Sequence, residues 1–359
     1  MPTLIDIYKQ PLVLAILVLI CMSSRVLAST INCPNTLNLK PTYQTKVPVS
    51  LYIEGTLSVH QKSSKSENEF FVAPEVELIN SCSQSLTAKT FIAPLPERLN
   101  IFSHQSKESR SGAFINVSSV DQKMAMEKKG PSWHAYTASF LDLRFVGATV
   151  RLAHGLVTLD GEINSVQDLV GKRIGLVMRP SSLRVLQEAV LMNVWDIYDQ
   201  ITVKEYPPGE MSQALDRGEV DVIFLPVIRE TKGKLLPINL DFNRTDIHWI
   251  SISLKDVKTA MEKTLILTDH MVLPEIIKLA NKEEIGLITF DVAWFTFAST
   301  PDDVVYDFLQ AVRHVCPSET NVCPTISTDR LLLWPKLETK LIHPGAQRFY
   351  KEENAISYP

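Results

Sequence analysis

The sequence predicts an α/β protein of two lobes joined by a hinge, each lobe a mostly parallel sheet flanked by helices. Strand and helix patterns alternate through residues 165–226, and a weaker series of the same kind occupies residues 48–131. Two long apolar runs, 143–159 and 284–298, are each long enough to lead the chain from one lobe into the other. Strands that alternate with helices are joined by right-handed crossovers, which produce parallel pairing.

The composition suits a globular protein with enough apolar material for two cores. The chain has 359 residues, of which 45% are hydrophobic and 21% charged, and its formal net charge is −4. That length and composition suggest two domains of ordinary size. The sequence contains no basic run, so a nucleic-acid partner is not expected.

Residues 1–28 have the pattern of a targeting segment. Residues 11–22 form an apolar core, and the residues ending at Ala28 satisfy the small-residue rule for cleavage. The core is shorter than the roughly 20 apolar residues that a membrane span needs. We therefore expect an exported, periplasmic protein cleaved near Ala28. Because Asp6 offsets Lys9, an uncleaved anchor remains the alternative.

The cysteines indicate an oxidising compartment. Once Cys21 is removed with the targeting segment, Cys33, Cys82, Cys316 and Cys323 remain, an even number that favours disulfides. Cys316 and Cys323 flank a short loop, so a local bridge between them is the natural pairing, which would leave Cys33 for Cys82. The alternatives are free thiols or a metal site, but a zinc site needs closer ligand pairs.

The first lobe is predicted from residues 47–150, after an extended leader at 29–46. Alternating apolar patterns predict its strands and helical spacing predicts its helices, in the order strand 48–59, helix 70–81, strand 86–93, helix 97–103, strand 113–117 and helix 121–129. Gly130 and Pro131 end the last of these helices.

The second lobe is predicted from residues 151–285. Ser165 and Asp168 fit a capping box, and Gly171 stops that short helix. The elements that follow are a strand at 173–178, a helix after Ser182 with apolar residues at helical spacing, a strand at 201–206, a helix at 210–217 and a buried strand at 220–225.

Residues 286–359 are expected to return to the first lobe and end in helices. Thr300 caps a helix that has Pro301 at its first position and acidic residues in its first turn. The alternative interpretation of the two long apolar runs is a pair of buried strands within one large domain.

The turn at residues 179–182 is the first candidate site, because ligands of parallel sheets lie beyond the carboxyl ends of the strands. Ser181 and Ser182 stand at a helix start, where free N–H groups favour an anion. Capping of the helix is the local role of one serine, and the two roles can coexist. Arg179 could pair with a carboxylate or could be solvated.

The first lobe offers matching positions at its own strand ends. Glu54, Gly55 and Thr56 follow the first strand, where turn formation is the alternative role. Ser118 and Ser119 follow the third strand, and Ser119 precedes the helix that holds Asp121, so capping is its favoured role.

The sequence contains none of the common catalytic motifs. The sequence has no His-Glu-x-x-His, no Gly-x-Ser-x-Gly and no glycine-rich phosphate loop. Its eight histidines are scattered. We therefore expect a protein that captures a ligand without chemistry and without a cofactor, and a secreted enzyme is the less favoured class.

Three segments, in this order, resemble the TAXI family of TRAP-transporter solute receptors. They are INSVQDLVGKRI at 163–174, PDDVVY at 301–306 and HPGAQRFY at 343–350. The resemblance runs from Leu143 to Tyr350 and is thin in the first lobe. It implies a two-lobed, type II periplasmic-binding-protein fold. It also implies a monomer that captures a small anionic solute, such as a carboxylate or amino acid, and delivers it to membrane-embedded transporter subunits.

The departures from this family fall on the ligand loops. The first loop has one glycine, Gly55, where the family has several, and Ser119 replaces a glutamine. Leu183 replaces a threonine, and Leu225 and Pro226 replace a small-residue loop after the last strand. These changes motivate an alternative function, a ligand sensor that uses the same scaffold for signalling.

Overall fold

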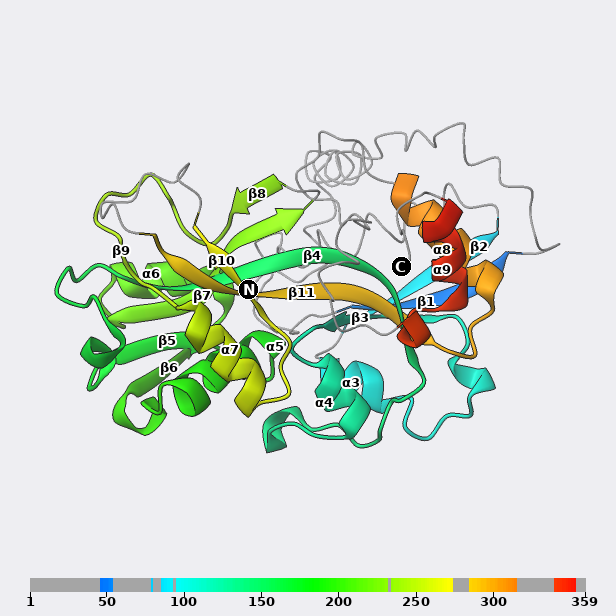
Figure 1. Ribbon diagram of the computed structural model, residues 1–359, viewed down its shortest axis with the longest axis horizontal. Coiled ribbons are helices and arrows are strands. Elements are labelled where there is room, and N and C mark those ends of the chain that lie inside the picture. Colours follow the sequence, from blue (N-terminus) through cyan, green and yellow to red (C-terminus); the bar gives the residue numbers. More distant parts are fainter. Residues whose placement is uncertain are drawn as a thin grey trace, which may run out of the picture.

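The described residues form one curved sheet of eleven strands with helices on both sides (Figure 1). The structure is a computed structural model that describes residues 46–53, 79, 85–92, 95–231, 234–273, 284–314 and 339–352. The main order of the strands is β2-β1-β3-β11-β4-β7-β5-β6, with β10 on β11, β8 on β7 and β9 on β4. The architecture is therefore the mixed α/β class that the alternation of strands and helices predicts.

The elements gather into two halves, right and left in Figure 1. The first half contains β1 (Val47–Ile53), β2 (Leu86–Ile92), β3 (Ala113–Ser118), α3 (Leu95–Asn100), α4 (Gln122–Glu127), α8 (Asp302–His314) and α9 (Pro344–Glu352). Its strands β2, β1 and β3 are parallel neighbours.

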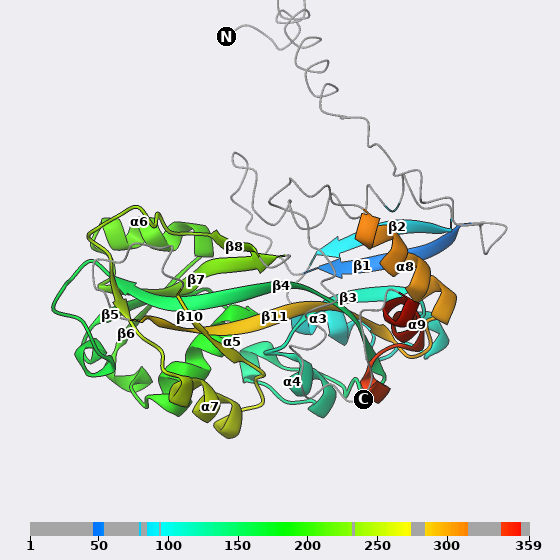
Figure 2. The ribbon, with the colours of Figure 1, turned by 45° about the horizontal axis from the view of Figure 1, so that its top comes forward.

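The second half repeats this arrangement, with β6, β5 and β7 as parallel neighbours. Its elements are β5 (Arg173–Val177), α5 (Ser182–Glu188), β6 (Thr202–Tyr206), α6 (Met211–Asp216), β7 (Val222–Thr231), β8 (Lys234–Pro237), β9 (His248–Ile250), α7 (Leu254–Lys263) and β10 (Asp269–Val272). Figure 2 shows α6 above the sheet and α3, α4, α5 and α7 below it, with α8 beside β1 and β2.

Two long strands, β4 (Leu143–Thr158) and β11 (Gly286–Phe297), cross between the halves. They pair antiparallel from Leu143 opposite Phe297 to His154 opposite Ile288. β11 also pairs with β3, and β4 also pairs with β7. Two register shifts interrupt the β4–β11 pairing on either side of Ala293 and Trp294. Such bulges bend a strand, and both strands are curved in Figure 1.

The predicted elements within the described ranges are largely confirmed. The capping box of Ser165 and Asp168 is present, although it opens a single 3-10 turn, Val166–Leu169. The helix that begins at Ser182 continues beyond α5 as a π-helix, Ala189–Val194. The strand predicted at 220–225 is longer, because β7 extends to Thr231. The sequence patterns missed β8, β9, β10 and α7.

Several predictions lie outside the described residues. They are the targeting segment at 1–28, most of the leader at 29–46, the helix at 70–81 apart from Ile79, and the disulfide between Cys316 and Cys323 with the pairing of Cys33 and Cys82. The lobe boundaries at residues 150 and 285 stay predictions.

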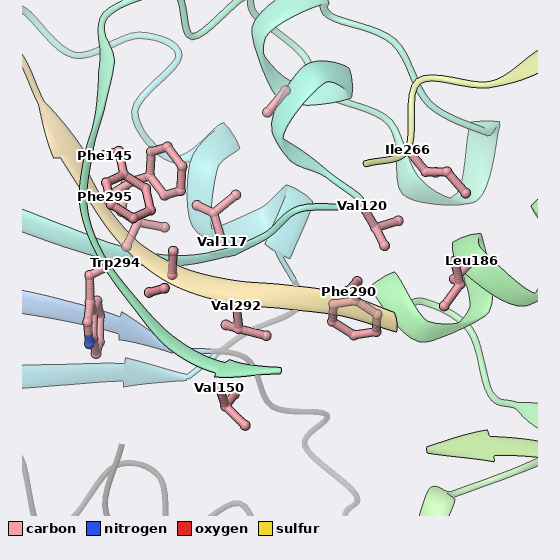
Figure 3. Close-up of a cluster of buried hydrophobic side chains, with 14 of the residues drawn as sticks. Val117, Val120, Phe145, Val150, Leu186, Ile266, Phe290, Val292, Trp294 and Phe295 are labelled. Carbon is pink, nitrogen blue, oxygen red and sulfur yellow. The ribbon is translucent and has the colours of Figure 1, made fainter. Parts of the chain in front are cut away.

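One hydrophobic cluster runs through both halves and packs against the crossing strands (Figure 3). It includes Phe114 and Phe308, whose rings stack with centroids 3.9 Å apart, and Leu186 of the second half. A second cluster, which includes Met211 and Trp249, lies within the second half. Among the described residues, no helix combines the length and the apolar character that a membrane span requires.

Gly286, at the start of β11, provides a test of this packing. A Cβ atom at this position would clash with the backbone oxygen of Ile252 and would meet the His270 ring at 2.5 Å. We expect Gly286→Ala to lower the free energy of unfolding by about 1–3 kcal/mol, as measured by urea denaturation. A Cβ atom at Gly209 would have no neighbouring atom within 4 Å, so Gly209→Ala is the matched control. Equal stability of the two variants would contradict the close approach.

His154 of β4 provides a pH-dependent test. Burial lowers the pKa of His154 to about 3, against a smaller opposite effect of the Leu152 backbone, and its ring stacks on Phe290 with centroids 5.3 Å apart. The unfolded chain therefore binds a proton at His154 as the pH falls below about 6.5, while the folded protein does not. This group's contribution to stability is complete above that pH and is lost as the pH falls toward 3.

We expect His154→Phe to remove this dependence. Between pH 6 and pH 4 the wild-type free energy of unfolding should fall by about 1.4 kcal/mol per pH unit more than that of the variant. Urea denaturation at several pH values measures both slopes. Parallel slopes would show that His154 is protonated in the folded protein.

Candidate functional site

The carboxyl ends of the parallel strands in each half face the other half. In Figure 2 the arrowheads of β1 and β2 point toward the second half, and that of β7 points toward the first. The turns that follow these strands therefore approach one another beside the crossing strands. We define the junction as residues 118–121 and 133–136 of the first half, and residues 179–182 and 264–268 of the second.

Asp121 is the centre of a fully buried polar cluster on the first-half side of the junction. Its Oδ1 lies 2.5 Å from His134 Nε2 and accepts from the Tyr136 hydroxyl at 2.8 Å. Its Oδ2 accepts from the Ser118 hydroxyl at 2.5 Å. Because a carboxylate only accepts, the shared proton of the first contact belongs to Nε2. The cluster fixes the turn after β3 against residues 134–136.

The surroundings of Asp121 keep its carboxylate ionised. Burial raises the pKa of Asp121, but attraction to His134 and hydrogen bonds from His134 and Ser118 outweigh burial, so that its pKa is lowered. Ser182 begins α5 in the second half and is itself buried. Its Oγ has no hydrogen-bond partner among the described residues.

Ser119 joins three parts of the chain and does not cap α4, so the expected capping role is wrong. Its hydroxyl donates to the backbone oxygen of Leu267 at 2.6 Å and accepts from the backbone N–H of Asp291 at 3.1 Å. The backbone of Ser119 also bonds to both residues. The N-cap position of α4 is Asp121. These non-local partners have no signature in the local sequence, which explains the error.

Ser181 has the capping role that the sequence predicts. Its backbone is extended, and its hydroxyl accepts from the N–H of Leu183 at 3.2 Å. Ser181 and Ser182 are both buried at the junction. The structure thus places the two serines at a helix start beside the first half, as expected from the turn at 179–182.

Arg179 is partly exposed, with 35% of its side chain accessible, and the edge formed by its Nε and Nη2 pairs within the second half. Its Nε donates to Glu188 Oε1 at 3.1 Å, and its Nη2 also pairs with that oxygen. Nη2 further lies 3.3 Å from the Tyr198 hydroxyl. The face of the guanidinium lies over the ring of Trp133, with Cζ 4.8 Å from the centroid.

Leu225 and Pro226 lie inside β7 and not in a loop after it, which corrects the expected end of this strand. Leu225 is opposite Gly155 and Pro226 is opposite His154, where the register of β4 and β7 shifts. A proline has no N–H for a regular ladder, but it is tolerated at such an irregularity. Both residues are buried.

Other predicted positions cannot be placed. Glu54, Gly55 and Thr56 lie outside the described residues, as do Cys316 and Cys323. Within the described ranges, no group of three or more His, Cys, Asp or Glu side chains is arranged to hold a metal ion.

The sequence patterns did not predict a role for four residues: Trp133, His134 and Tyr136 of the junction, and Glu188, which pairs with Arg179. The first three follow Gly130 and Pro131 in a stretch without periodicity. The only local signal of burial in this stretch is the presence of two aromatic residues, Trp133 and Tyr136, close to His134. Glu188 lies four residues after Arg184, with which it forms an ion pair at 2.8 Å, a spacing that is visible in the sequence.

Comparison with protein families and solved structures adds two findings. A family model described as the NMT1-like family matches residues 111–353. The chain is also similar to the structure of a periplasmic transporter, with 10% identity, coverage of 87% of this chain and 99% of that chain, and a TM-score of 0.46.

Two further solved structures are similar at the same level. For the periplasmic binding protein BugD the identity is 11%, the coverage 86% of this chain and 98% of that chain, and the TM-score 0.45. For malate-bound MatC of Rhodopseudomonas palustris the identity is 13%, the coverage 87% and 99%, and the TM-score 0.44.

The buried cluster predicts a large effect of Asp121 on stability. We expect Asp121→Ala to lower the free energy of unfolding at pH 7 by about 3–5 kcal/mol, because it leaves buried donors without their shared acceptor. The control is Asp142→Ala, which removes a partly exposed ion pair with Arg110 at 3.3 Å and should cost about 1 kcal/mol or less. Denaturant titration measures both, and similar losses would contradict the central role of Asp121.

Proposed function

Since this chain belongs to the NMT1-like family, we propose that it is an extracytoplasmic solute-binding receptor that captures a small anionic solute between its two halves. The observation that carries this proposal is the junction itself. Two halves with the same strand order direct the carboxyl ends of their parallel strands at one another, and only β4 and β11 run the length between them in the part of the chain that the structure describes. Ligands of open α/β sheets bind at such strand ends.

The crossing strands give the architecture a means of closing. Bending at the register shifts near Ala293 and Trp294 would move one half relative to the other without breaking the parallel pairing within either half. A solute that contacts both halves would favour the closed arrangement by its difference in affinity for the two states. Capture of this kind needs neither a cofactor nor a catalytic group.

The anionic class of solute is argued from the start of α5. The first turn of a helix has N–H groups without intrahelical partners, which favour negative charge, and here the helix runs on through the π-helix to Val194. Ser181 and Ser182 would contribute hydroxyls. In the first half, Ser118 and Ser119 border the same junction, and Glu54, Gly55 and Thr56 stay proposed contacts.

The delivery of the solute is the finer part of the proposal. The TAXI-like segments at 163–174, 301–306 and 343–350 support membrane-embedded TRAP-type transporter subunits as the partners of a periplasmic monomer. Leu225 and Pro226 stay in the proposal only as backbone neighbours of the junction, because their side chains are buried in β7.

A thermal-shift screen tests the proposed function. Monocarboxylates, dicarboxylates and amino acids are added to the purified protein, and a true solute at a hundred times its Kd should add about 2.7 kcal/mol of stability. Titration calorimetry then gives the Kd. If no anionic compound shifts the melting temperature, the proposed class of solute is wrong.

Two serine variants locate the site. Ser181→Ala should weaken binding of the identified solute about tenfold or more, because it removes a hydroxyl donor to a charged group, and Ser182→Leu should abolish binding by filling the junction. The matched control is Ser253→Ala, which removes the N-cap of α7 and a similar capping energy of about 1 kcal/mol. Equal weakening by both alanine variants would place the solute elsewhere.

A further inference from the structure

The contact between Arg179 and Trp133 spans the junction. Arg179 follows β5 in the second half, and Trp133 belongs to a short 3-10 helix, Ser132–His134, in the first half. The guanidinium carbon lies 4.8 Å from the centroid of the Trp133 ring. Cation–π contacts of this geometry attract because the face of the ring is negative.

Each partner of this contact is held in place by further contacts within its own half. Arg179 is fixed by Glu188, which also receives a hydrogen bond from Arg184 Nε at 2.8 Å. Tyr198 donates to the same carboxylate oxygen at 3.2 Å. Glu188 and Arg184 are buried, so this support moves only with the second half.

Trp133 has an equivalent support in the first half. Its neighbour His134 is bound to Asp121, and the two rings of Trp133 and His134 meet edge to face with centroids 5.5 Å apart. The stack therefore joins two rigid supports, one in each half. Such a contact responds to the relative position of the halves more than to movement of either side chain.

We propose that the Arg179–Trp133 stack is a latch that holds the two halves closed in the absence of solute. This inference rests on the proposed closure of the halves and assigns Arg179 a role different from binding the solute. A cation–π contact is worth enough to shift the closed-to-open ratio by several-fold, and up to about thirtyfold when it is desolvated. Its loss would therefore increase the open population without altering either half.

The test compares variants without solute, by amide hydrogen exchange and small-angle scattering. The N–H of Leu267 bonds to the backbone oxygen of Ser119 across the junction at 3.1 Å. We expect Trp133→Ala and Arg179→Ala each to raise exchange in residues 264–268 several-fold and to increase the radius of gyration. The double variant should show no more exchange and no larger radius of gyration than either single variant, because the two substitutions remove the same contact.

A matched control removes the same kind of contact within one half. Arg348 lies over the ring of Tyr306 with Cζ 4.3 Å from the centroid, and it pairs with Asp303 at 2.8 Å. Arg348→Ala should leave exchange at 264–268 and the radius of gyration unchanged. Trp133→Phe keeps an aromatic face, so its exchange at 264–268 and its radius of gyration should lie between those of wild type and Trp133→Ala. This variant provides the test if Trp133→Ala folds poorly.

The outcomes separate the latch from the proposed function. Wild-type exchange and scattering in both alanine variants would overturn the latch, even if a solute is found. The same holds if Arg348→Ala opens the junction equally, or if the two single effects add fully in the double variant. Failure of every anionic solute to bind would instead overturn the proposed function, because the latch is measured without solute.

Discussion

The antiparallel pairing of β4 with β11 is the constraint that places every other element. Each of these strands has one further neighbour along the main path of the sheet, β3 beside β11 and β7 beside β4. Arg151 and Asp291, opposite each other on the two strands, form a buried bidentate ion pair at 2.9 and 3.2 Å. Without this pairing the two sets of parallel strands would have no fixed relation, and the junction would not exist.

At the junction, the charged side chains that the structure describes are matched by partners within the chain. The Asp121 carboxylate receives hydrogen bonds from three residues of its own half, and Arg179 and Arg184 share Glu188. Hydrogen bonds of this kind hold buried side chains rigidly. The charged groups of the junction are therefore already paired within their own halves. The groups that remain to recognise a solute are hydroxyls and backbone N–H groups rather than unpaired ions.

Local signals in the sequence determined much of what could be predicted. Apolar runs marked β4 and β11, and the capping serines Ser165 and Ser181 marked the turns that they begin. The turn at 179–182 was correctly assigned to a strand-end edge. Short or irregular elements such as β8 and β9 were missed, because a strand of three or four residues has too few positions to show a period.

The wrong predictions at the site have a different origin, because the residues concerned contact segments that are distant in the sequence. Ser119 looked like a cap, but its partners, Leu267 and Asp291, come from distant segments. Pro226 looked like the end of a strand, but a register shift opposite His154 accommodates it. The importance of Asp121 depends on its contacts with His134 and Tyr136. The chain brings these residues to Asp121 by folding back on itself, and their sequence separation matches no helical or strand period. Such contacts follow from the tertiary fold and cannot be predicted from a single sequence.

The place of β11 in the sheet also affects how the protein is made. β3 pairs with β11, which leaves the ribosome long after β3 has been synthesised. Until then one edge of the first half remains open, whereas β5, β6 and β7 follow one another closely and can assemble early. An open strand edge is a template for aggregation, so we expect the edge of β3 to be the most exposed part of the sheet until β11 is synthesised.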